Sequence, residues 1–205
     1  VADGMGGAQA GEVASGLAVA ALGELPSEPD NAEDALVEAI SDANRRIHDK
    51  AQEDRELEGM GTTMTAALVH DGKVTLGHVG DSRAYRWREG ELAQLTDDHS
   101  LVAELERHGK LTAAEARVHP QRSMILRALG IAPDVEVDTY CFEGREGDLF
   151  MLCTDGLCGL VHDEVIGEVL RDAQSLELAA QELIELANLS GGPDNITTVL
   201  FRLGT

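Results

Sequence analysis

The sequence predicts an α+β fold, a four-layer α-β-β-α sandwich in which two antiparallel sheets lie between outer layers of helices. Three observations favour it. Helical periodicity is found near the two ends of the chain, strand-like segments fill the middle, and turns such as Asp71-Gly72 and Glu89-Gly90 join consecutive strands. Strands joined by such short turns pair antiparallel. Helices from both ends of the chain then cover the outer faces of the sheets.

The first quarter of the chain is predicted to be mainly helical. Apolar and small residues recur at helical spacing from Ala10, and residues 10–25 are expected to form one unbroken helix. Residues 26–30 form a loop, after which Asn31 caps a second helix. The apolar stripe of that second helix consists of Leu36, Ile40, Ala43 and Ile47.

From Gly61 the pattern changes to that of strands. Strands are expected at 63–70, 73–78, 82–88, 92–95, 135–142, 148–153 and 196–203. Residues 101–130, which we call the flap, interrupt this series with two short helices at 101–108 and 113–118. An insertion of this length within a sheet is often functional. Two further helices, at 163–171 and 175–189, precede the last strand.

Composition limits the classes of function. With 205 residues and 43% apolar content, the chain suits one folded domain, 1–205, and we expect a monomer. A net charge of −22 and an aromatic content of 3% exclude a nucleic-acid partner, because phosphate would be repelled and few rings could stack on bases. No segment approaches the 18 apolar residues of a membrane helix. Three cysteines without a Cys-x-x-Cys pair predict buried thiols in the reducing cytoplasm, at positions Cys141, Cys153 and Cys158.

Three aspartates mark a candidate metal site. Asp3 lies in Val-Ala-Asp-Gly-Met-Gly-Gly, Asp155 follows the apolar run 149–153, and Asp194 lies in Gly-Gly-Pro-Asp-Asn before the last strand. Aspartate suits a strand end, where the backbone turns, and we expect these three ends to meet. Two like charges about 4 Å apart repel by roughly 4 kcal/mol at an effective dielectric of 20. One or more divalent cations would remove that repulsion and create a catalytic site.

The glycines around Asp3 leave two interpretations open. Gly4, Gly6, Gly7 and Gly11 form either a plain tight turn before a helix or a turn that brings a backbone carbonyl and Asp3 to a metal ion. The dinucleotide fingerprint fails, because Gln9 stands where its third glycine should be. A nucleotide-dependent oxidoreductase also needs a second strand ending near residue 24, where a helix is predicted.

A series of motifs extends across nearly the whole chain. They are Val-Ala-Asp-Gly-Met-Gly-Gly at 1–7, Gly-Thr-Thr at 61–63, Val-Gly-Asp-Ser-Arg-Ala-Tyr at 79–85, Thr-Asp-Asp-His-Ser at 96–100, His-Pro-Gln-Arg at 119–122, Leu-Arg-Ala-Leu-Gly at 126–130, Thr-Asp-Gly-Leu at 154–157 and Pro-Asp-Asn-Ile-Thr at 193–197. In this order they resemble the bacterial branch of the type-2C metal-dependent serine/threonine protein phosphatases.

The resemblance implies hydrolysis of phosphoserine and phosphothreonine in proteins that a bacterial kinase has phosphorylated. It implies two Mn²⁺ or Mg²⁺ ions, with Asp3 bridging both, the carbonyl of Gly4 on one, and Asp155 and Asp194 on the other. Asp98 would join Asp155 in a weaker third site. A water bridging two ions about 3.5–4 Å apart becomes hydroxide near neutral pH and attacks phosphorus in line.

Other polar residues have structural interpretations as well. Arg122 and Arg127 of the flap either meet a phosphopeptide or form surface ion pairs, and the sequence leaves both open. We interpret residues 81–83 as a structural turn with an ion pair. His99 and His119 are interpreted as anchors of loops.

The start of the chain motivates an alternative. Val1 is expected to lie inside a strand, which suggests that upstream sequence is missing. The family's N-terminal strands carry an arginine that grips phosphate and an acidic pair that holds one metal through water. The alternative is therefore a non-catalytic domain of the same fold that binds a partner through the flap. Phosphatases of the stress-regulator branch generally lack the flap, so residues 101–130 argue against that branch.

Overall fold

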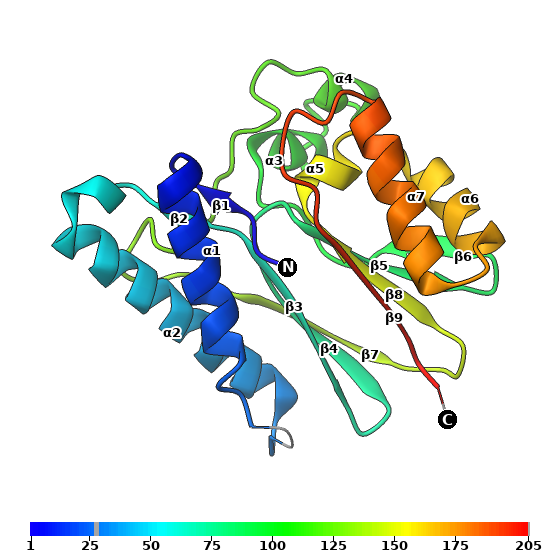
Figure 1. Cartoon of the computed structure of the whole chain (residues 1–205), viewed down its shortest axis with the longest axis horizontal. Coiled ribbons are helices and arrows are strands. Elements are labelled where there is room, and N and C mark those ends of the chain that lie inside the picture. The colour runs from blue at the N-terminus through cyan, green and yellow to red at the C-terminus, as the bar shows by residue number, and fades with distance from the viewer. Residues whose placement is uncertain (27–28, 205) are drawn as a thin grey trace.

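Two antiparallel sheets lie between two layers of helices in the computed structural model, which describes residues 1–26 and 29–204 (Figure 1). One sheet has the order β3-β4-β7, with strands Met64–His70, Lys73–Val79 and Asp138–Glu143. The other has the order β6-β5-β8-β9, with strands Glu91–Gln94, Arg83–Arg88, Leu149–Cys153 and Thr198–Arg202. The predicted α-β-β-α sandwich is confirmed.

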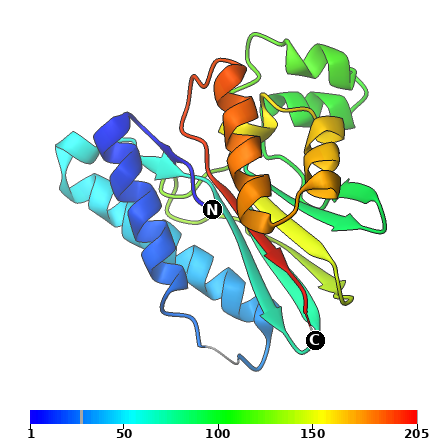
Figure 2. The same cartoon turned by 45° about the vertical axis from the view of Figure 1, so that its right-hand side comes forward.

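Each sheet has its own helical layer (Figure 2). Helix α2 (Ala32–Glu53) packs on the three-stranded sheet with α1 (Ala8–Leu22) beside it, and α6 (Asp163–Asp172) and α7 (Leu176–Leu189) pack on the four-stranded sheet. Asn31 caps α2 as predicted, because its side chain accepts hydrogen bonds from two N–H groups of the first turn. The predicted stripe of α2 is fully buried and consists of Leu36, Ile40, Ala43 and Ile47.

Strand β8 uses both of its faces. Leu149, Met151 and Cys153 pack toward the C-terminal helices, whereas Phe150 and Leu152 pack between the two sheets. All five are buried, as predicted for an apolar run with core on both sides. Burial of a side chain as large as Phe150 is worth about 1.5–3 kcal/mol. The strand is therefore firmly held where the chain turns into Asp155.

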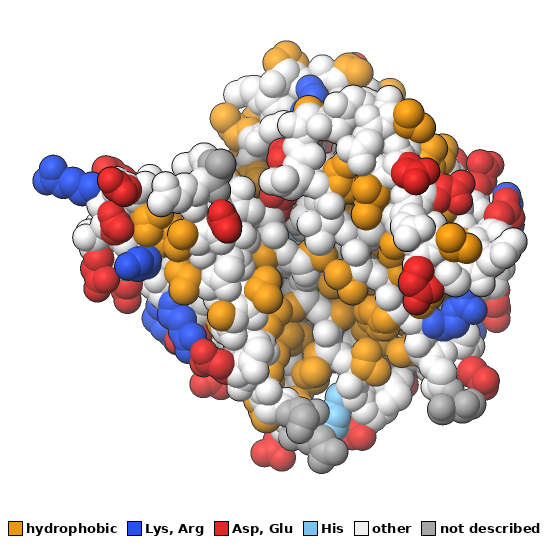
Figure 3. Space-filling view, in the orientation of Figure 1, with side chains coloured by type: hydrophobic (Ala, Val, Ile, Leu, Met, Phe, Trp, Pro, Cys, Tyr) orange, Lys and Arg blue, Asp and Glu red, His pale blue; other side chains and the backbone are white. Residues whose placement is uncertain are grey.

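The core between the sheets reaches the surface on one side of the molecule. Strands β3 and β9 are edge strands, and Figure 3 shows hydrophobic side chains gathered between the two helical layers on this face. Val69 of β3 is 49% exposed and Val199 of β9 is 47% exposed.

Val1 was expected in a strand. It lies outside the assigned strands, but it exchanges two main-chain hydrogen bonds with Thr65, of 2.8 and 3.0 Å, and so runs along the start of β3.

Several predicted boundaries were wrong by a few residues. Helix α1 ends at Leu22, with Gly23 as its C-cap, and not at residue 25. Of the predicted loop 26–30, residues 27–28 lie outside the described residues. Strand β7 begins at Asp138 and not at 135, and the last strand spans Thr198–Arg202 and not 196–203. These strands extend only where a neighbouring strand pairs with them.

Three small elements were not predicted. Strand β1 (Gly4–Met5) pairs antiparallel with β2 (Gly61–Thr62), a 3₁₀ turn η1 spans Arg55–Leu57, and a one-turn helix α5 spans Asp155–Cys158. Elements this short carry no periodic signal. The two predicted flap helices are present as α3 (Leu101–Arg107) and α4 (Ala113–Arg117), at one end of the sandwich (Figure 1).

The structure can be compared with two expectations from composition, the buried cysteines and the absence of a membrane helix. Cys153 is buried and Cys158 is partly buried, but Cys141 is exposed on the edge strand β7, so the prediction of three buried thiols was wrong for Cys141. Among the helices that the structure describes, none combines the length and apolar character that crossing a membrane requires.

The C-terminal end of the flap is fixed to α2. The Oδ1 of buried Asn44 accepts a hydrogen bond of 2.8 Å from the N–H of Gly130, and its Nδ2 donates to the carbonyls of Ala132 and Pro133, both at 3.0 Å. Gly130 has φ +86°, and a Cβ there would lie 2.2 Å from Cγ2 of Ile47. Only glycine fits this position without displacing α2 or the backbone.

Gly130→Ala is expected to lower the free energy of unfolding by more than about 2 kcal/mol, because overpacking adds to the cost of an alanine at positive φ. Gly16→Ala is the matched control, since Gly16 lies in α1 with open space around its Cα. It should raise the free energy of unfolding by up to about 1 kcal/mol. Urea unfolding of both variants measures the difference, and equal effects would contradict this packing.

Candidate functional site

Asp3 is held at the edge of the sandwich by the segment that leads into β3. Its carbonyl accepts hydrogen bonds from the N–H of Thr63 and from the hydroxyl of Thr62, both at 2.9 Å. Its own N–H donates to Oγ1 of Thr63 at 3.0 Å. Three bonds on one residue's main chain fix the position from which the Asp3 carboxylate extends.

Asp155 and Asp194 are brought together by contacts between their two loops. A Cβ on Gly156 would lie 2.2 Å from the carbonyl oxygen of Asn195, so the first turn of α5 lies directly against the segment after Asp194. Thr154 adds two hydrogen bonds to Thr197: its N–H donates to the carbonyl, and its hydroxyl accepts from the N–H, both at 3.1 Å. Only glycine fits at position 156, because a side chain there would collide with the backbone of Asn195.

The carboxylates of the three predicted aspartates are close enough to affect one another. Burial, followed by the charge and hydrogen bonding of Asp155 and the charges of Asp194 and Asp81, raises the pKa of Asp3 to about 7. The structure thus brings together the residues that the sequence analysis placed at three meeting strand ends.

A fourth carboxylate, Asp81, belongs to the same cluster. It is 8% exposed, and burial with the charges of Asp155 and Asp98 raises its pKa to about 7. The sequence analysis treated it only as part of a structural turn. The signal that could have identified it was present, because Val79-Gly80-Asp81 also places an aspartate beside a glycine at the end of a strand.

Asp98, predicted for a third metal site, is held by an arginine. Arg83 donates to both of its carboxylate oxygens, from Nε at 2.9 Å and from Nη2 at 2.8 Å. Gln94 donates a further bond of 3.2 Å. Arg83 of the turn at 81–83 does form an ion pair, but its partner is Asp98 outside the turn and not Asp81. A metal at Asp98 would compete with this pair, and the third site stays a prediction.

The glycines beside Asp3 are explained in part by close packing. A Cβ on Gly4 would lie 2.0 Å from the carbonyl oxygen of Gly11, so β1 touches the first turn of α1 through bare backbone. Gly6 and Gly7 have φ values of +102° and +94°, which glycine adopts most readily. The tight-turn interpretation accounts for these four positions, and the carbonyl of Gly4 as a metal ligand remains an inference from the resemblance.

The cluster fits divalent ions that keep part of their water shell. The Oδ1 of Asp155 is buried without a hydrogen-bond partner among the described residues, and a buried carboxylate oxygen needs one. Within residues 1–26 and 29–204, no three acidic, histidine or cysteine side chains converge tightly enough to hold an ion by themselves. Mg²⁺ sites commonly use only one or two carboxylates, with waters completing the shell. The donors present match that pattern.

A cavity of about 700 Å³ extends from Asp81 and Asp155 to the flap. Arg122 of the flap lines it, whereas Arg127 is not among the lining residues because it pairs with Asp138 and Glu136. For Arg127 the structure therefore shows the ion-pair alternative. The cavity is bounded on the flap side chiefly by Val102, Ala103, Ala113, Ala116 and Val118.

Comparison with known proteins agrees with this geometry. The family model described as "Protein phosphatase 2C" matches residues 1–191. The serine/threonine protein phosphatase PstP of Mycobacterium tuberculosis is 45% identical over 202 residues, which are 98% of this chain and 39% of that protein. The serine/threonine phosphatase stp of Listeria welshimeri is 41% identical over 206 residues, 98% of this chain and 82% of that protein. The chain thus spans about two fifths of the length of the mycobacterial relative.

Solved structures match over the whole fold. A crystal structure of M. tuberculosis PstP has a TM-score of 0.94 at 45% identity and covers 100% of this chain and 87% of that chain. A structure of the PstP catalytic domain in complex with two manganese ions has a TM-score of 0.89 at 43% identity, covering 97% and 84%. With matching motifs, fold and acidic cluster, the chain belongs to the protein phosphatase 2C family.

Proposed function

We propose that this domain hydrolyses phosphoserine and phosphothreonine in proteins with the help of two divalent ions, Mn²⁺ or Mg²⁺. The observation that carries the proposal is a loose cluster of four carboxylates, Asp3, Asp81, Asp155 and Asp194, whose charges affect one another. Two of them, Asp81 and Asp155, line a cavity that the flap borders. The relatives are named serine/threonine phosphatases, and one related structure holds two manganese ions. Both support the same activity for this chain.

The protein's part in the reaction is to hold charge and substrate in place. When bound, the ions lower the pKa of coordinated water and offset charge on the phosphoryl oxygens. Asp3 and Asp155, whose carboxylates lie next to each other, are the residues that would hold them, with Asp194 and the carbonyl of Gly4. The main-chain bonds at Asp3 and the loop contacts at Asp155 keep these groups fixed while a phosphoryl group is bound.

Substrate would approach through the cavity beneath the flap. Arg122 is exposed and lines that cavity, so its guanidinium is available to a phosphate or an acidic side chain of a phosphoprotein. We further propose that the substrates are products of a bacterial serine/threonine kinase and that the domain acts as a monomer in the cytoplasm. A third, weaker ion at Asp98 and Asp155 would require Asp98 to leave Arg83.

The test of this proposal is release of phosphate from a phosphothreonine peptide in the presence of Mn²⁺, with EDTA as a control. Asp155→Asn and Asp194→Asn should each reduce turnover by about 100-fold or more, because loss of a metal removes several kcal/mol of transition-state stabilisation. Asp134→Asn is the matched control, at an exposed aspartate outside the site. Full activity of Asp155→Asn or Asp194→Asn would refute the metal assignment. Absence of release from the unaltered chain would favour the non-catalytic alternative.

Metal binding should depend on pH. The pKa values of Asp3 and Asp81 are raised to about 7, so these groups hold protons that an ion must displace. Mn²⁺ affinity is expected to rise at least about 10-fold from pH 6 to pH 8. Calorimetric titration across this range measures it, and an affinity that is independent of pH would contradict the assigned charges.

The stability of the metal-free domain should change in the opposite direction. Because the folded-state pKa values of Asp3 and Asp81 lie above the usual aspartate value, the folded state binds these protons more tightly than the unfolded state does. This contribution is fully present near pH 4 and is lost as pH rises through about 7. Melting temperatures in EDTA should accordingly fall over that range once the effect of other groups is subtracted with Asp3→Asn.

Arg122→Ala should raise the KM for a phosphopeptide with little change in kcat, because Arg122 lines the cavity from the flap and is not one of the clustered carboxylates. Loss of one exposed charge-assisted contact is expected to cost about 3- to 10-fold in KM. Arg145→Ala is the matched control, an exposed arginine outside the cavity lining. If both variants behaved alike, the assignment of Arg122 to substrate binding would fail.

A further inference from the structure

His99 lies at a junction between the flap and the turn that carries Asp81. Its N–H donates to the carbonyl of Gly80 at 2.7 Å, and its Nδ1 accepts from the N–H of Gly80 at 3.1 Å. Its own carbonyl accepts from the N–H of Leu126, at the far end of the flap, at 2.7 Å. One buried residue therefore binds both polar groups of the Gly80 main chain and the returning segment of the flap at Leu126.

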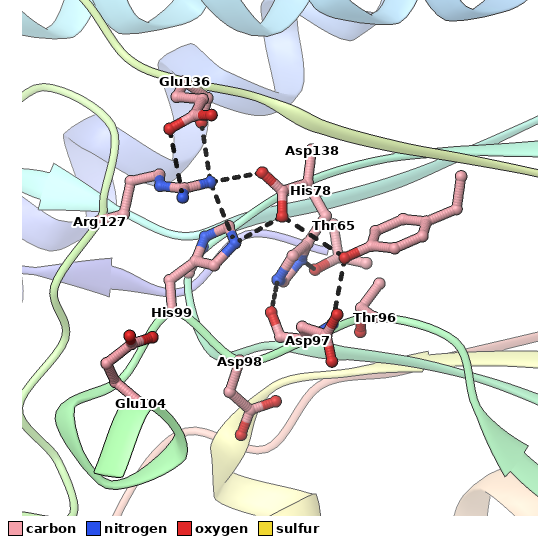
Figure 4. Close-up of polar contacts among 12 residues, drawn as sticks. Thr65, His78, Thr96, Asp97, Asp98, His99, Glu104, Arg127, Glu136 and Asp138 are labelled. Carbon is pink, nitrogen blue, oxygen red and sulfur yellow. Dashed lines mark hydrogen bonds and ion pairs between the residues drawn. The ribbon is translucent and has the colours of Figure 1, made fainter. Parts of the chain in front are cut away.

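These bonds determine which nitrogen of His99 carries the proton. Nδ1 accepts from a backbone N–H, so it carries no hydrogen. The proton then resides on Nε2, which lies 3.1 Å from Oδ2 of Asp138 and donates to it (Figure 4). Because Nδ1 carries no hydrogen, the ring is neutral. This tautomer satisfies Gly80 and Asp138. Nη1 of Arg127 also lies 3.1 Å from Nε2, but its donor is satisfied by Oδ1 of Asp138.

Asp138 is oriented in turn by the flap. Arg127 donates to Oδ1 of Asp138 at 2.5 Å, leaving Oδ2 for His99 (Figure 4). Burial opposes the charge, yet the bonds from His99 and Arg127 lower the pKa of Asp138 overall. Arg127 also binds the carbonyl of Glu136 at 3.3 Å. The chain of contacts runs from the end of the flap through Asp138 and His99 to Gly80.

Gly80 has little freedom on its other side. Its φ is +116°, and a Cβ there would lie 2.5 Å from Cβ of Thr63. Thr63 bonds Ser82 at 2.8 Å and also holds the main chain of Asp3. The Asp81 turn is thus held between Thr63 and His99, and the bonds of His99 connect it to the flap.

We propose that His99 is a positioning residue, which in its Nε2–H tautomer fixes the Gly80–Asp81 turn beside the carboxylate cluster and couples that turn to the flap through Asp138 and Arg127. The positioning of the Gly80–Asp81 turn follows from the hydrogen bonds of His99 alone. Its consequence for catalysis rests on the proposed phosphatase activity. The Asp138–His99 pair acts through the backbone of Gly80, without contact with a substrate.

The sharpest test is Asp138→Asn. Arg127 would retain the amide oxygen of this variant, so the amide NH₂ would face Nε2 of His99 and force the ring proton onto Nδ1. A donor would then face the N–H of Gly80, and that bond would break without loss of side-chain volume. A long-range ¹H–¹⁵N spectrum should show Nε2 protonated in the unaltered protein and Nδ1 protonated in the variant. The exchange of the Gly80 amide should accelerate in parallel.

Substitution of His99 separates hydrogen bonding from packing. His99→Asn keeps an acceptor where Nδ1 lies, whereas His99→Leu fills similar space without one. Mn²⁺ binding, measured by calorimetry, should weaken about 10-fold or more in His99→Leu and in Asp138→Asn, the range typical of residues that orient ligands, and should stay within about threefold in His99→Asn. His108→Leu, at a histidine 62% exposed, is the control.

The ring-proton position, the Gly80 amide exchange and the Mn²⁺ affinity can all be measured independently of the activity assay. A proton on Nδ1 of His99 in the unaltered protein would overturn the proposal, and so would His99→Leu with unchanged Gly80 exchange and Mn²⁺ affinity. Both readouts need no turnover. If they agree with the proposal while no phosphate is released, the proposed function fails and the positioning of Asp81 stands.

Discussion

The gathering of four carboxylates at one edge of the sandwich, where burial and mutual repulsion both oppose their charge, is the constraint on which the site depends. Asp3, Asp81, Asp155 and Asp194 come from four different segments and meet at one edge of the sandwich. Without a counter-charge, burial and the neighbouring charges raise the pKa values of Asp3 and Asp81 to about 7. Gathering these groups lowers the stability of the metal-free domain, and cations bound to them would raise it again. The surrounding structure is best understood as a frame that keeps the four groups from separating.

That frame is built mainly from backbone contacts. Bare glycine backbones meet at Gly4 and Gly11, and Gly156 lies against the carbonyl of Asn195. Threonine hydroxyls and main-chain bonds then fix Asp3 and the segment around Thr154. Because these contacts involve the main chain, the site depends on small residues at a few positions more than on large side chains. The two-sided burial of β8 supplies the rigid support beneath them.

Much of this could be predicted from the sequence. The four layers follow from where helical and strand periods occur, and the apolar run at β8 correctly indicated a strand buried on both faces. The placement of Asp3, Asp155 and Asp194 at meeting strand ends followed from the turn residues beside them. Asp81 was missed because its neighbour Arg83 suggested an ion pair, which the structure shows with Asp98 instead. Burial of a carboxylate depends on long-range packing that one segment does not reveal.

The positions of the flap residues could not be predicted for the same reason. Nothing local distinguishes Arg122, which lines the cavity, from Arg127, which Asp138 holds. Anomalous diffraction from a crystal soaked in Mn²⁺ tests the central claim most directly. The account predicts two manganese peaks within coordinating distance of the carboxylates of Asp3, Asp155 and Asp194. Strong peaks elsewhere with none at this cluster, at saturating Mn²⁺ and pH 8, would contradict it.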